Sequence, residues 1–295
     1  MSLFGEIIKV IVIGLVEGVT EWLPISSTGH MIIVNEFVEL DVSPDFLKLF
    51  LVVIQLGAIL AVIVLYFKRL NPWDRQKNDR ERHDTFDLWA KVIIASVPAA
   101  IIGLLFDDWV EEHFFNAFIV ALALIVYGFA FIVVERMHGE VKQPLHMRRY
   151  RVGDHESDEL DKITLMQAIG IGCFQCLAIV PGTSRSGSTI LGGRILGVSR
   201  RAAAEFSFLL AIPALFGWSL LKIIKTLVID HLAVKASEWL LLLIGIFVAF
   251  MVSLLVIRFL VNYVQKHSFV AFAWYRIALG AVVILYFAFT GGLFA

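Results

Sequence analysis

Long apolar runs alternate with short polar segments along the chain. Six of these runs are long enough, or nearly so, to cross about 30 Å of hydrocarbon as helices of about 20 residues. They cover roughly residues 47–67, 88–106, 114–134, 205–228, 238–261 and 268–290. Because apolar runs of this length are typical of membrane-spanning helices, the pattern predicts an all-α polytopic membrane protein.

Two shorter apolar runs, at about 5–23 and 163–180, lead directly into polar loops that contain Pro, Ser and Gly. A short helical segment follows each loop, at about 28–39 and 188–197. Backbone that leaves the helix at membrane depth is tolerated only where protein buries it or where it lines a water-filled cavity. Both stretches are therefore predicted to be re-entrant helix–loop–helix units.

The two halves of the chain share one plan, in which a re-entrant unit is followed by three transmembrane helices. A constant offset of 157 residues aligns Pro24 with Pro181 and Ser27 with Ser184. A re-entrant unit returns to its own side and three crossings is an odd number, so the second half begins on the opposite side of the membrane. The sequence therefore predicts an inverted-topology repeat, whose functional residues lie near the midplane on broken helices.

This plan also predicts the domain organisation. Residues 1–295 form a single membrane domain, in which the repeat halves span about 1–136 and 163–290. A charged loop, residues 137–162, joins the halves and is expected to be cytoplasmic.

The distribution of basic residues orients the chain in the membrane. Most of the 25 Lys and Arg residues lie on one side, in loops around 68–91, 136–162, 194–201 and 258–266. The loops on the other side, at 107–113 and 229–238, hold a single basic residue, Lys235. Since cytoplasmic loops are enriched in Lys and Arg, both chain ends are expected on the extracytoplasmic side.

Composition agrees with the membrane class. Hydrophobic residues make up 59% of the chain, the mean hydropathy is +0.83, and 17% of residues are charged, against about 25% in soluble domains. The net charge of −1 gives no sign of a nucleic-acid partner, and none is expected. The first twenty residues lack a basic segment and a small-residue cleavage site, so no signal peptide is predicted.

Ionisable residues concentrate just before the first polar loop. Glu17 and Glu21 are four residues apart, so on a helix they lie on one face, one turn from each other. In a low-dielectric site, two carboxylates this close would bind a proton or share a divalent cation. Because Mg²⁺ prefers carboxylates together with phosphate oxygens, the pair is a natural half-site for a phosphate–metal complex.

The two loops supply the remaining groups of a phosphoryl-transfer site. Ser26, Ser27 and Thr28 offer hydroxyl nucleophiles, and His30 is close enough in sequence to act as a base or as a proton donor. Arg185 is the only strong cation in either loop, and its planar donors suit a phosphoryl group. The backbone can approach a ligand closely at three glycines, Gly29, Gly182 and Gly187.

A second interpretation of the same carboxylates is a proton or Na⁺ site in a transporter, since inverted repeats with broken helices are common in transporters. The combination of Arg185, His30 and three consecutive hydroxyls suits phosphate better than an alkali cation. In the last predicted span, Arg276 is a candidate for an intramembrane ion pair, with Glu205 as a possible partner.

The two polar loops lie within two long motifs, Glu17-Gly-Val-Thr-Glu21-Trp-Leu-Pro-Ile-Ser-Ser-Thr-Gly-His30 and Pro181-Gly-Thr-Ser-Arg185-Ser-Gly-Ser-Thr189. These motifs resemble the signature regions of the undecaprenyl-pyrophosphate phosphatase family of the bacitracin-resistance type. Supporting matches in two later spans, Gln55-Leu-Gly-Ala-Ile and Glu205-Phe-Ser-Phe-Leu-Leu-Ala-Ile-Pro213, extend the similarity over nearly the whole chain. The Lys-x6-Arg-Pro motif of the other lipid-phosphatase family is missing.

The resemblance implies a bacterial plasma-membrane (inner-membrane) enzyme. It would hydrolyse undecaprenyl pyrophosphate to the monophosphate and inorganic phosphate, which recycles the carrier lipid for cell-wall synthesis and confers bacitracin resistance. It also implies a divalent cation, Mg²⁺ or Ca²⁺, a homodimer, a polyprenyl pyrophosphate lipid as substrate and an active site open to the extracytoplasmic side. A transporter or flippase of a polyprenyl phosphate lipid is the alternative.

The site residues follow from the two motifs. The catalytic set carried over from the family is Glu17, Glu21, Ser27, His30 and Arg185, with Glu17 and Glu21 as metal ligands. The surrounding loop residues are predicted to bind the substrate: Ser26, Thr28, Gly29, Gly182, Thr183, Ser184, Ser186 and Gly187. Ser27 would attack the terminal phosphorus, or metal-activated water would attack with Ser27 as a hydrogen-bonding residue. The glutamates could also serve as a base without binding metal.

Overall fold

Every regular element in the described part of this computed structural model, residues 2–114, 116–138 and 158–290, is a helix. In chain order the elements are α1 Leu3–Thr20, α2 Ser27–Phe37, α3 Pro44–Val53, α4 Gln55–Leu65, α5 Phe67–Leu70, α6 Asp79–Phe114, α7 Ala117–Met137, α8 Asp158–Asp161, α9 Leu165–Gln175, η1 Cys176–Ile179, α10 Arg185–Ile195, α11 Arg200–Ile223, η2 Ile224–Ile229, α12 Ala236–Val264 and α13 Val270–Thr290. The predicted all-α class is therefore confirmed.

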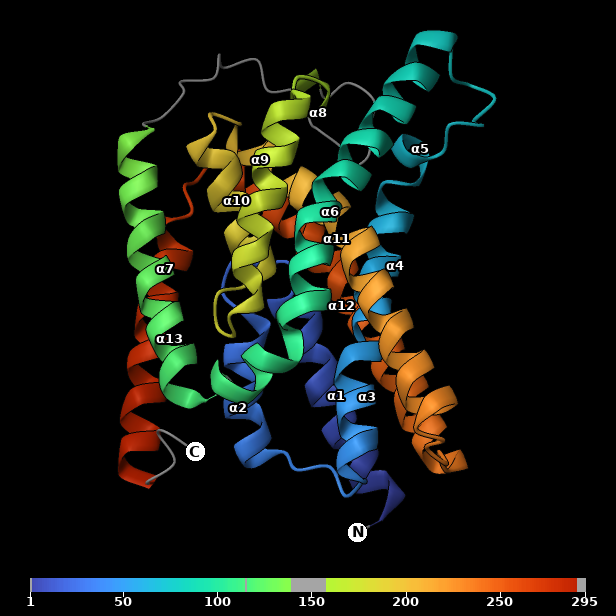
Figure 1. Ribbon diagram of the computed structural model, residues 1–295, viewed down its shortest axis with the longest axis vertical. Helices are drawn as coiled ribbons and strands as arrows, with labels where there is room; N and C mark the ends of the chain where they lie inside the picture. The colour runs from blue at the N-terminus through green and yellow to red at the C-terminus, as the bar shows by residue number, and fades with distance from the viewer. Residues whose placement is uncertain (1, 115, 139–157, 291–295) are drawn as a thin grey trace.

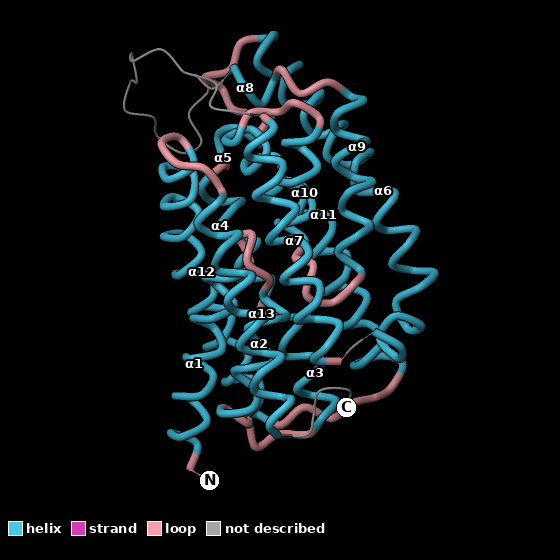
Figure 2. Tube along the Cα trace, turned by 90° about the vertical axis from the view of Figure 1, so that its left-hand side faces the viewer, coloured by secondary structure: helices cyan, strands magenta, loops and turns pink. Residues whose placement is uncertain are grey.

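Among the described residues, six helical stretches are long and apolar enough to cross a membrane, as the hydropathy pattern predicts. They are Pro44–Leu65, Asp79–Asp107, Ala117–Met137, Arg200–Ile229, Ala236–Val264 and Val270–Thr290. The chain is a multi-pass membrane protein. Figure 2 shows that the described residues form helices joined by short loops, most of them running along the long axis of the molecule.

Two spans differ in detail from the predicted boundaries. The first is interrupted at Ile54, so that α3 and α4 are separate helices. The helix α6 starts nine residues earlier than expected, because its polar first turns are capped by a reciprocal pair of hydrogen bonds. The Asn78 N–H donates to Glu81 Oε2 at 2.8 Å, and the Glu81 N–H donates to Asn78 Oδ1 at 2.9 Å. An apolar run alone does not reveal such polar extensions.

The two predicted broken helices are present. In Figure 1, the pair α1 and α2 lies at the end of the molecule that carries the N terminus, and the pair α9 and α10 lies at the opposite end. The C-terminal end of α13 lies at the same end as the start of α1, whereas α5 and α8 lie at the other end. The charged loop that joins the halves, predicted to be cytoplasmic, is described only in part, because residues 139–157 fall outside the described residues.

Close helix crossings hold the broken helices in place. The most extensive contacts join α13 to α7, α1 to α12 and α12 to α4. Two glycines permit backbone contact, one where α4 crosses α12 and one where α9 crosses α6. A Cβ at Gly57 would lie 2.1 Å from the carbonyl oxygen of Ile246, and one at Gly172 would lie 2.1 Å from that of Ala95. Because real side chains cannot approach this closely, glycine is required at both crossings.

Candidate active site

Two serines with the same unusual backbone conformation begin the second helix of each broken pair. Ser26 has φ 72° and Ser184 has φ 73°, in the left-handed region that non-glycine residues seldom adopt. Each caps its helix, because Ser26 Oγ accepts the N–H of Gly29 at 3.2 Å and Ser184 Oγ accepts that of Gly187 at 3.1 Å. The two caps are alike, although the offset of 157 residues aligns Ser184 with Ser27 and not with Ser26.

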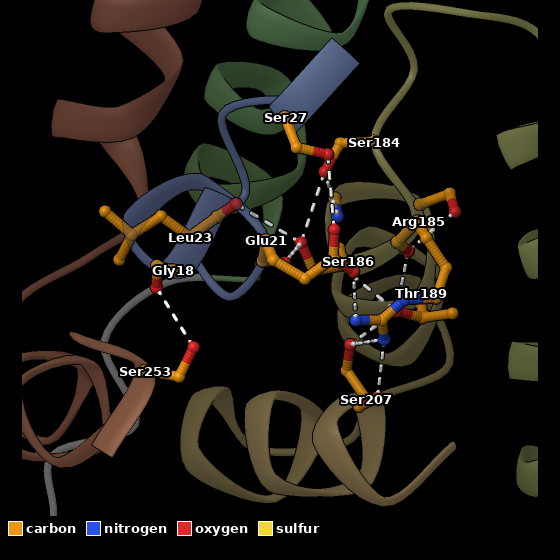
Figure 3. A network of polar contacts seen from close by, with 12 residues as sticks. Gly18, Glu21, Leu23, Ser27, Ser184, Arg185, Ser186, Thr189, Ser207 and Ser253 are labelled. Carbon is orange, nitrogen blue, oxygen red and sulfur yellow. Dashed lines mark hydrogen bonds and ion pairs between the residues drawn. The ribbon is translucent and has the colours of Figure 1, made fainter. Parts of the chain in front are cut away.

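Glu21 lies at the centre of the contacts between the two loops (Figure 3). Arg185 Nη2 donates to Glu21 Oε1 at 2.9 Å, and Ser27 Oγ donates to Glu21 Oε2 at 3.2 Å. The hydroxyl of Ser186 donates to the backbone carbonyls of Glu21 and Leu23, at 2.9 and 3.2 Å. Residues more than 160 positions apart in sequence are thus joined into one polar cluster.

The helix α11 and an aromatic ring hold the Arg185 guanidinium in position. Arg185 Nη1 donates to the Ser207 carbonyl at 2.8 Å, and the hydroxyls of Ser207 and Thr189 are hydrogen-bonded at 2.7 Å. The guanidinium carbon lies 5.7 Å from the centroid of the buried Trp22 ring, in cation–π range. Among the described residues Arg185 Nε is buried and has no hydrogen-bond partner.

Glu17, one turn before Glu21, is buried with an unsatisfied oxygen. Its exposed fraction is 2%, and Oε1 has no hydrogen-bond partner in the described part of the chain. The helix α1 is fixed here against α12, because the Ser253 hydroxyl donates to the Gly18 carbonyl at 3.4 Å. A buried carboxylate oxygen without a partner is costly, so it needs a proton or a cation.

His30 is held between the first loop and α13. His30 Nδ1 lies 2.7 Å from the Ser26 carbonyl oxygen, which can only accept, so Nδ1 carries the hydrogen. In the neutral ring Nε2 then accepts from the hydroxyl of Tyr275 at 2.8 Å. The two rings are nearly parallel, with centroids 5.5 Å apart. Among the described residues, Ser27 is therefore hydrogen-bonded to Glu21 and not to His30.

Arg276, the residue after Tyr275, is fully buried, but its contacts differ from the expected ion pair. Its donors reach four backbone carbonyls, those of Pro24, Gly182, Thr183 and Leu124. Glu205 instead pairs with Arg201 at 3.4 Å, one turn away on α11. The suggested pairing of Arg276 with Glu205 is wrong, because loop carbonyls lie closer to the guanidinium than any carboxylate among the described residues.

The sequence matches a known family over nearly its full length. The family model of the bacitracin resistance protein BacA matches residues 10–282. The chain belongs to the BacA family. A relative named undecaprenyl-diphosphatase from Enterococcus faecalis is 49% identical over 288 residues, which cover 98% of this chain and 100% of the relative.

Other relatives carry the same name. A Streptococcus thermophilus protein named undecaprenyl-diphosphatase is 51% identical over 95% of this chain and 93% of its own. In Clostridioides difficile, undecaprenyl-diphosphatase 1 is 49% identical over 96% of both chains. These names describe a hydrolase, so the comparisons do not favour the transporter alternative.

In this BacA-family chain, the structure brings most of the predicted site residues together. Ser27 and Arg185 each contact the Glu21 carboxylate, and Glu17 and His30 lie within one helical turn of that cluster. Thr28 belongs to the same first turn of α2 as Ser27. The remaining loop residues form the two caps and the carbonyl contacts described above: Ser26, Gly29, Gly182, Thr183, Ser184, Ser186 and Gly187.

The carboxylates fit a divalent cation only together with other oxygens. Within the described ranges, no three His, Cys, Asp or Glu side chains form a group that could hold a metal. Among the described residues both oxygens of Glu21 have partners, whereas Glu17 Oε1 is buried without one. A cation bound here would therefore need phosphate oxygens to complete its coordination, as Mg²⁺ sites commonly do.

Two residues of the site were not identified from the sequence. Tyr275 is 245 residues from His30, and Ser207 lies 22 residues after Arg185 on a different helix. Both occur in apolar spans, where Tyr and Ser are ordinary packing residues. Only the packing of α13 and α11 against the loops brings them into the site.

Proposed function

We propose that this protein hydrolyses undecaprenyl diphosphate to undecaprenyl phosphate and inorganic phosphate. The relatives at about 50% identity carry the name of that activity. The observation that carries the proposal is the hydrogen bond between Ser27 and Glu21, with Arg185 on the other oxygen of the same carboxylate. A hydroxyl, a base and a cation meet there beside the N-termini of α2 and α10, which favour anions.

The reaction follows from this arrangement in two steps. Glu21 accepts the proton of Ser27 as the hydroxyl oxygen attacks the terminal phosphorus, and the bond from phosphorus to the bridging oxygen breaks. Undecaprenyl phosphate leaves, and water then hydrolyses the phosphoserine to regenerate Ser27 and release phosphate. Arg185 and the backbone N–H groups of the capped helices bind the phosphoryl oxygens, and His30 handles the proton of the leaving group.

A competing course has water as the attacking group, with Ser27 only donating a hydrogen bond. In either course Glu17 is the residue with a free oxygen to hold a divalent cation, Mg²⁺ or Ca²⁺. Such a cation would neutralise the charge of the diphosphate. The residue assignments for substrate and metal are part of this proposal.

We also propose that the halves 1–136 and 163–290 form an inverted-topology repeat within one membrane domain. Three features support it: matching backbone conformations at Ser26 and Ser184, equal lengths of 11 residues for α2 and α10, and broken pairs at opposite ends of the molecule. With the Lys- and Arg-rich loops in the cytoplasm, this protein of the bacterial plasma membrane opens its site to the extracytoplasmic side. The homodimer implied by the family resemblance belongs to the same proposal.

Phosphate release by the purified protein in detergent tests the activity. A short-chain isoprenyl diphosphate serves as substrate, with Mg²⁺, with Ca²⁺ or with EDTA. We expect release with a divalent cation, strong reduction with EDTA, and none with the Glu21→Gln variant. Absence of release under every cation would exclude the hydrolase, whereas undiminished release in EDTA would exclude only the metal.

A further inference from the structure

Arg276 is a fully buried cation that contacts both loops but has no part in the reaction proposed above. Its exposed fraction is 0%, and it follows Tyr275, the partner of His30, on α13. Fully burying a guanidinium costs several kcal/mol unless its donors are satisfied. The groups that accept hydrogen bonds from its donors therefore indicate its role.

The guanidinium joins both loops. Nη1 donates to the carbonyl of Pro24 in the first loop, at 3.1 Å. Nη2 donates to the carbonyls of Gly182 and Thr183 in the second loop, at 3.1 and 2.9 Å. Nε donates to the Leu124 carbonyl on α7 at 3.4 Å, so the same side chain also fixes the loops against a membrane-spanning helix.

Gly187 leaves room for the guanidinium, and Gly182 lets the second loop pack against Val120 on α7. A Cβ at Gly187, in the first turn of α10, would lie 2.9 Å from Arg276 Nη1. A Cβ at Gly182, where φ is +90°, would lie 2.5 Å from the Val120 carbonyl oxygen. Because the loop can follow this path only with glycine at these positions, the backbone around the guanidinium is shaped for close approach.

No described carboxylate lies within ion-pair distance of Arg276, in contrast to Arg185, which pairs with Glu21. The side chain is instead surrounded by carbonyl dipoles and by the face of the Tyr127 ring, 5.4 Å from the guanidinium carbon. Its positive charge is therefore uncompensated at the point where the two loops meet. An anion bound between the loops would experience that charge in a low-dielectric environment.

We propose that Arg276 is a positioning residue that holds the first loop, with Glu21 and Ser27, in register with the second loop, which carries Arg185. Its uncompensated charge also favours binding of the diphosphate. This inference rests on the proposed hydrolase function. A purely structural residue would affect only the fraction of folded protein. A positioning residue also affects kcat of the protein that is folded.

Two substitutions separate geometry from charge. Arg276→Lys keeps the charge, but a lysine lacks the planar, spread donors that reach carbonyls in both loops. We therefore expect kcat to fall about 100-fold, which is the effect of displacing reacting groups by about 1 Å. The KM should stay near the wild-type value. Arg276→Met also removes the charge, so its KM should rise in addition to the loss of kcat.

Arg194 provides a matched control. It is also nearly buried, with an exposed fraction of 4%, but at the other end of α10, where it pairs with Glu135 at 3.3 Å and donates to the Val198 carbonyl at 2.8 Å. Arg194→Lys and Arg194→Met measure the general effect of altering a buried arginine. Folded protein of both control variants should retain the wild-type kcat.

Steady-state phosphate release, combined with size-exclusion profiles and thermal unfolding in detergent, decides the outcome. A wild-type kcat for Arg276→Lys would overturn the inference, as would a loss of activity that only follows the folded fraction or that the Arg194 variants share. If neither Arg276 variant folds while both Arg194 variants do, the residue belongs to the folding core and the inference is wrong. An inactive wild type would overturn the proposed function itself, which separates the two failures.

Discussion

At the scale of single residues, the Glu21 carboxylate contacts both the cation and the hydroxyl of the two motifs. Glu21 accepts from Arg185 and from Ser27, so it can align a cation and activate a hydroxyl at the same time. His30 is engaged by Ser26 and Tyr275 and makes no hydrogen bond to Ser27. Ser27 is thus bonded to Glu21, and His30 to Tyr275. One test addresses the attacking group, and a second addresses the hydrogen bond from Tyr275 to His30.

Ser27→Ala distinguishes a serine nucleophile from attack by water. If Ser27 forms the covalent intermediate, phosphate release should fall by at least about 10³-fold, because the loss of a nucleophile removes most of the catalysed rate. The measurement is kcat for the purified variant with a short-chain isoprenyl diphosphate. Ser219→Ala is the control, since the buried Ser219 hydroxyl also makes a hydrogen bond, but to the Val52 carbonyl away from the site. Near-normal turnover of Ser27→Ala would establish water as the attacking group.

Tyr275→Phe tests whether the hydroxyl on α13 supports His30. The substitution preserves the stacked ring but leaves His30 Nε2 without its donor, so we expect kcat/KM to fall about tenfold, within the range of one lost hydrogen bond to a catalytic group. A second tyrosine–histidine stack, Tyr263 with His267 at 4.6 Å, lies away from the site and supplies the control Tyr263→Phe. Equal activity of the two variants would show that Tyr275 only packs against His30.

At the scale of the helices, the crossings that support the site include a backbone contact that requires glycine. The helix α4 lies against α12 at Gly57, and α12 in turn packs along α1, which ends just before Glu21. A larger side chain at Gly57 must therefore separate α4 from α12. The displacement would be transmitted toward the first loop through α1.

Gly57→Ala is expected to destabilise the protein. The added Cβ would lie 2.1 Å from the Ile246 carbonyl oxygen, and relieving such overpacking costs about 1–3 kcal/mol. The thermal unfolding midpoint in detergent should fall accordingly. Gly103→Ala, on α6, is the control, because nothing lies within 4 Å of its added Cβ. That change should be neutral or stabilise by up to about 1 kcal/mol through helix propensity. The same shift for both variants would contradict the close crossing.

The helices could be predicted from sequence because their signals are local. Apolar runs determine the spans, and Pro with Ser and Gly interrupts α1 and α9 at the two loops. The polar start of α6 and the break at Ile54 depend instead on caps and packing, which hydropathy does not report. The contacts of Tyr275 and Ser207 with the site could not be predicted, because both are ordinary residues in apolar runs. Arg276 could be recognised as an unusual residue in a span, but its carbonyl partners depend on how α13 packs against the two loops.

At the scale of the whole molecule, the orientation in the membrane decides from which side the substrate reaches the site. In Figure 1 the start of α1 and the end of α13 lie at one end, and the Lys- and Arg-rich segment around α5 lies at the other. If basic loops face the cytoplasm, the α11–α12 connection is extracytoplasmic and the α12–α13 connection is cytoplasmic. The two connections can be probed separately.

Thiol labelling in intact cells tests this orientation. Cys173 and Cys176 are first replaced by serine, and single cysteines are then introduced as Ala233→Cys and Lys266→Cys, both at exposed positions. A membrane-impermeant maleimide should label Ala233→Cys in intact cells but Lys266→Cys only after permeabilisation, because the bilayer keeps the reagent from cytoplasmic loops. Phosphate release by both variants verifies that each retains the native fold. The reverse labelling pattern would place both chain ends in the cytoplasm, and labelling of both positions in intact cells would exclude a bilayer crossing by α12.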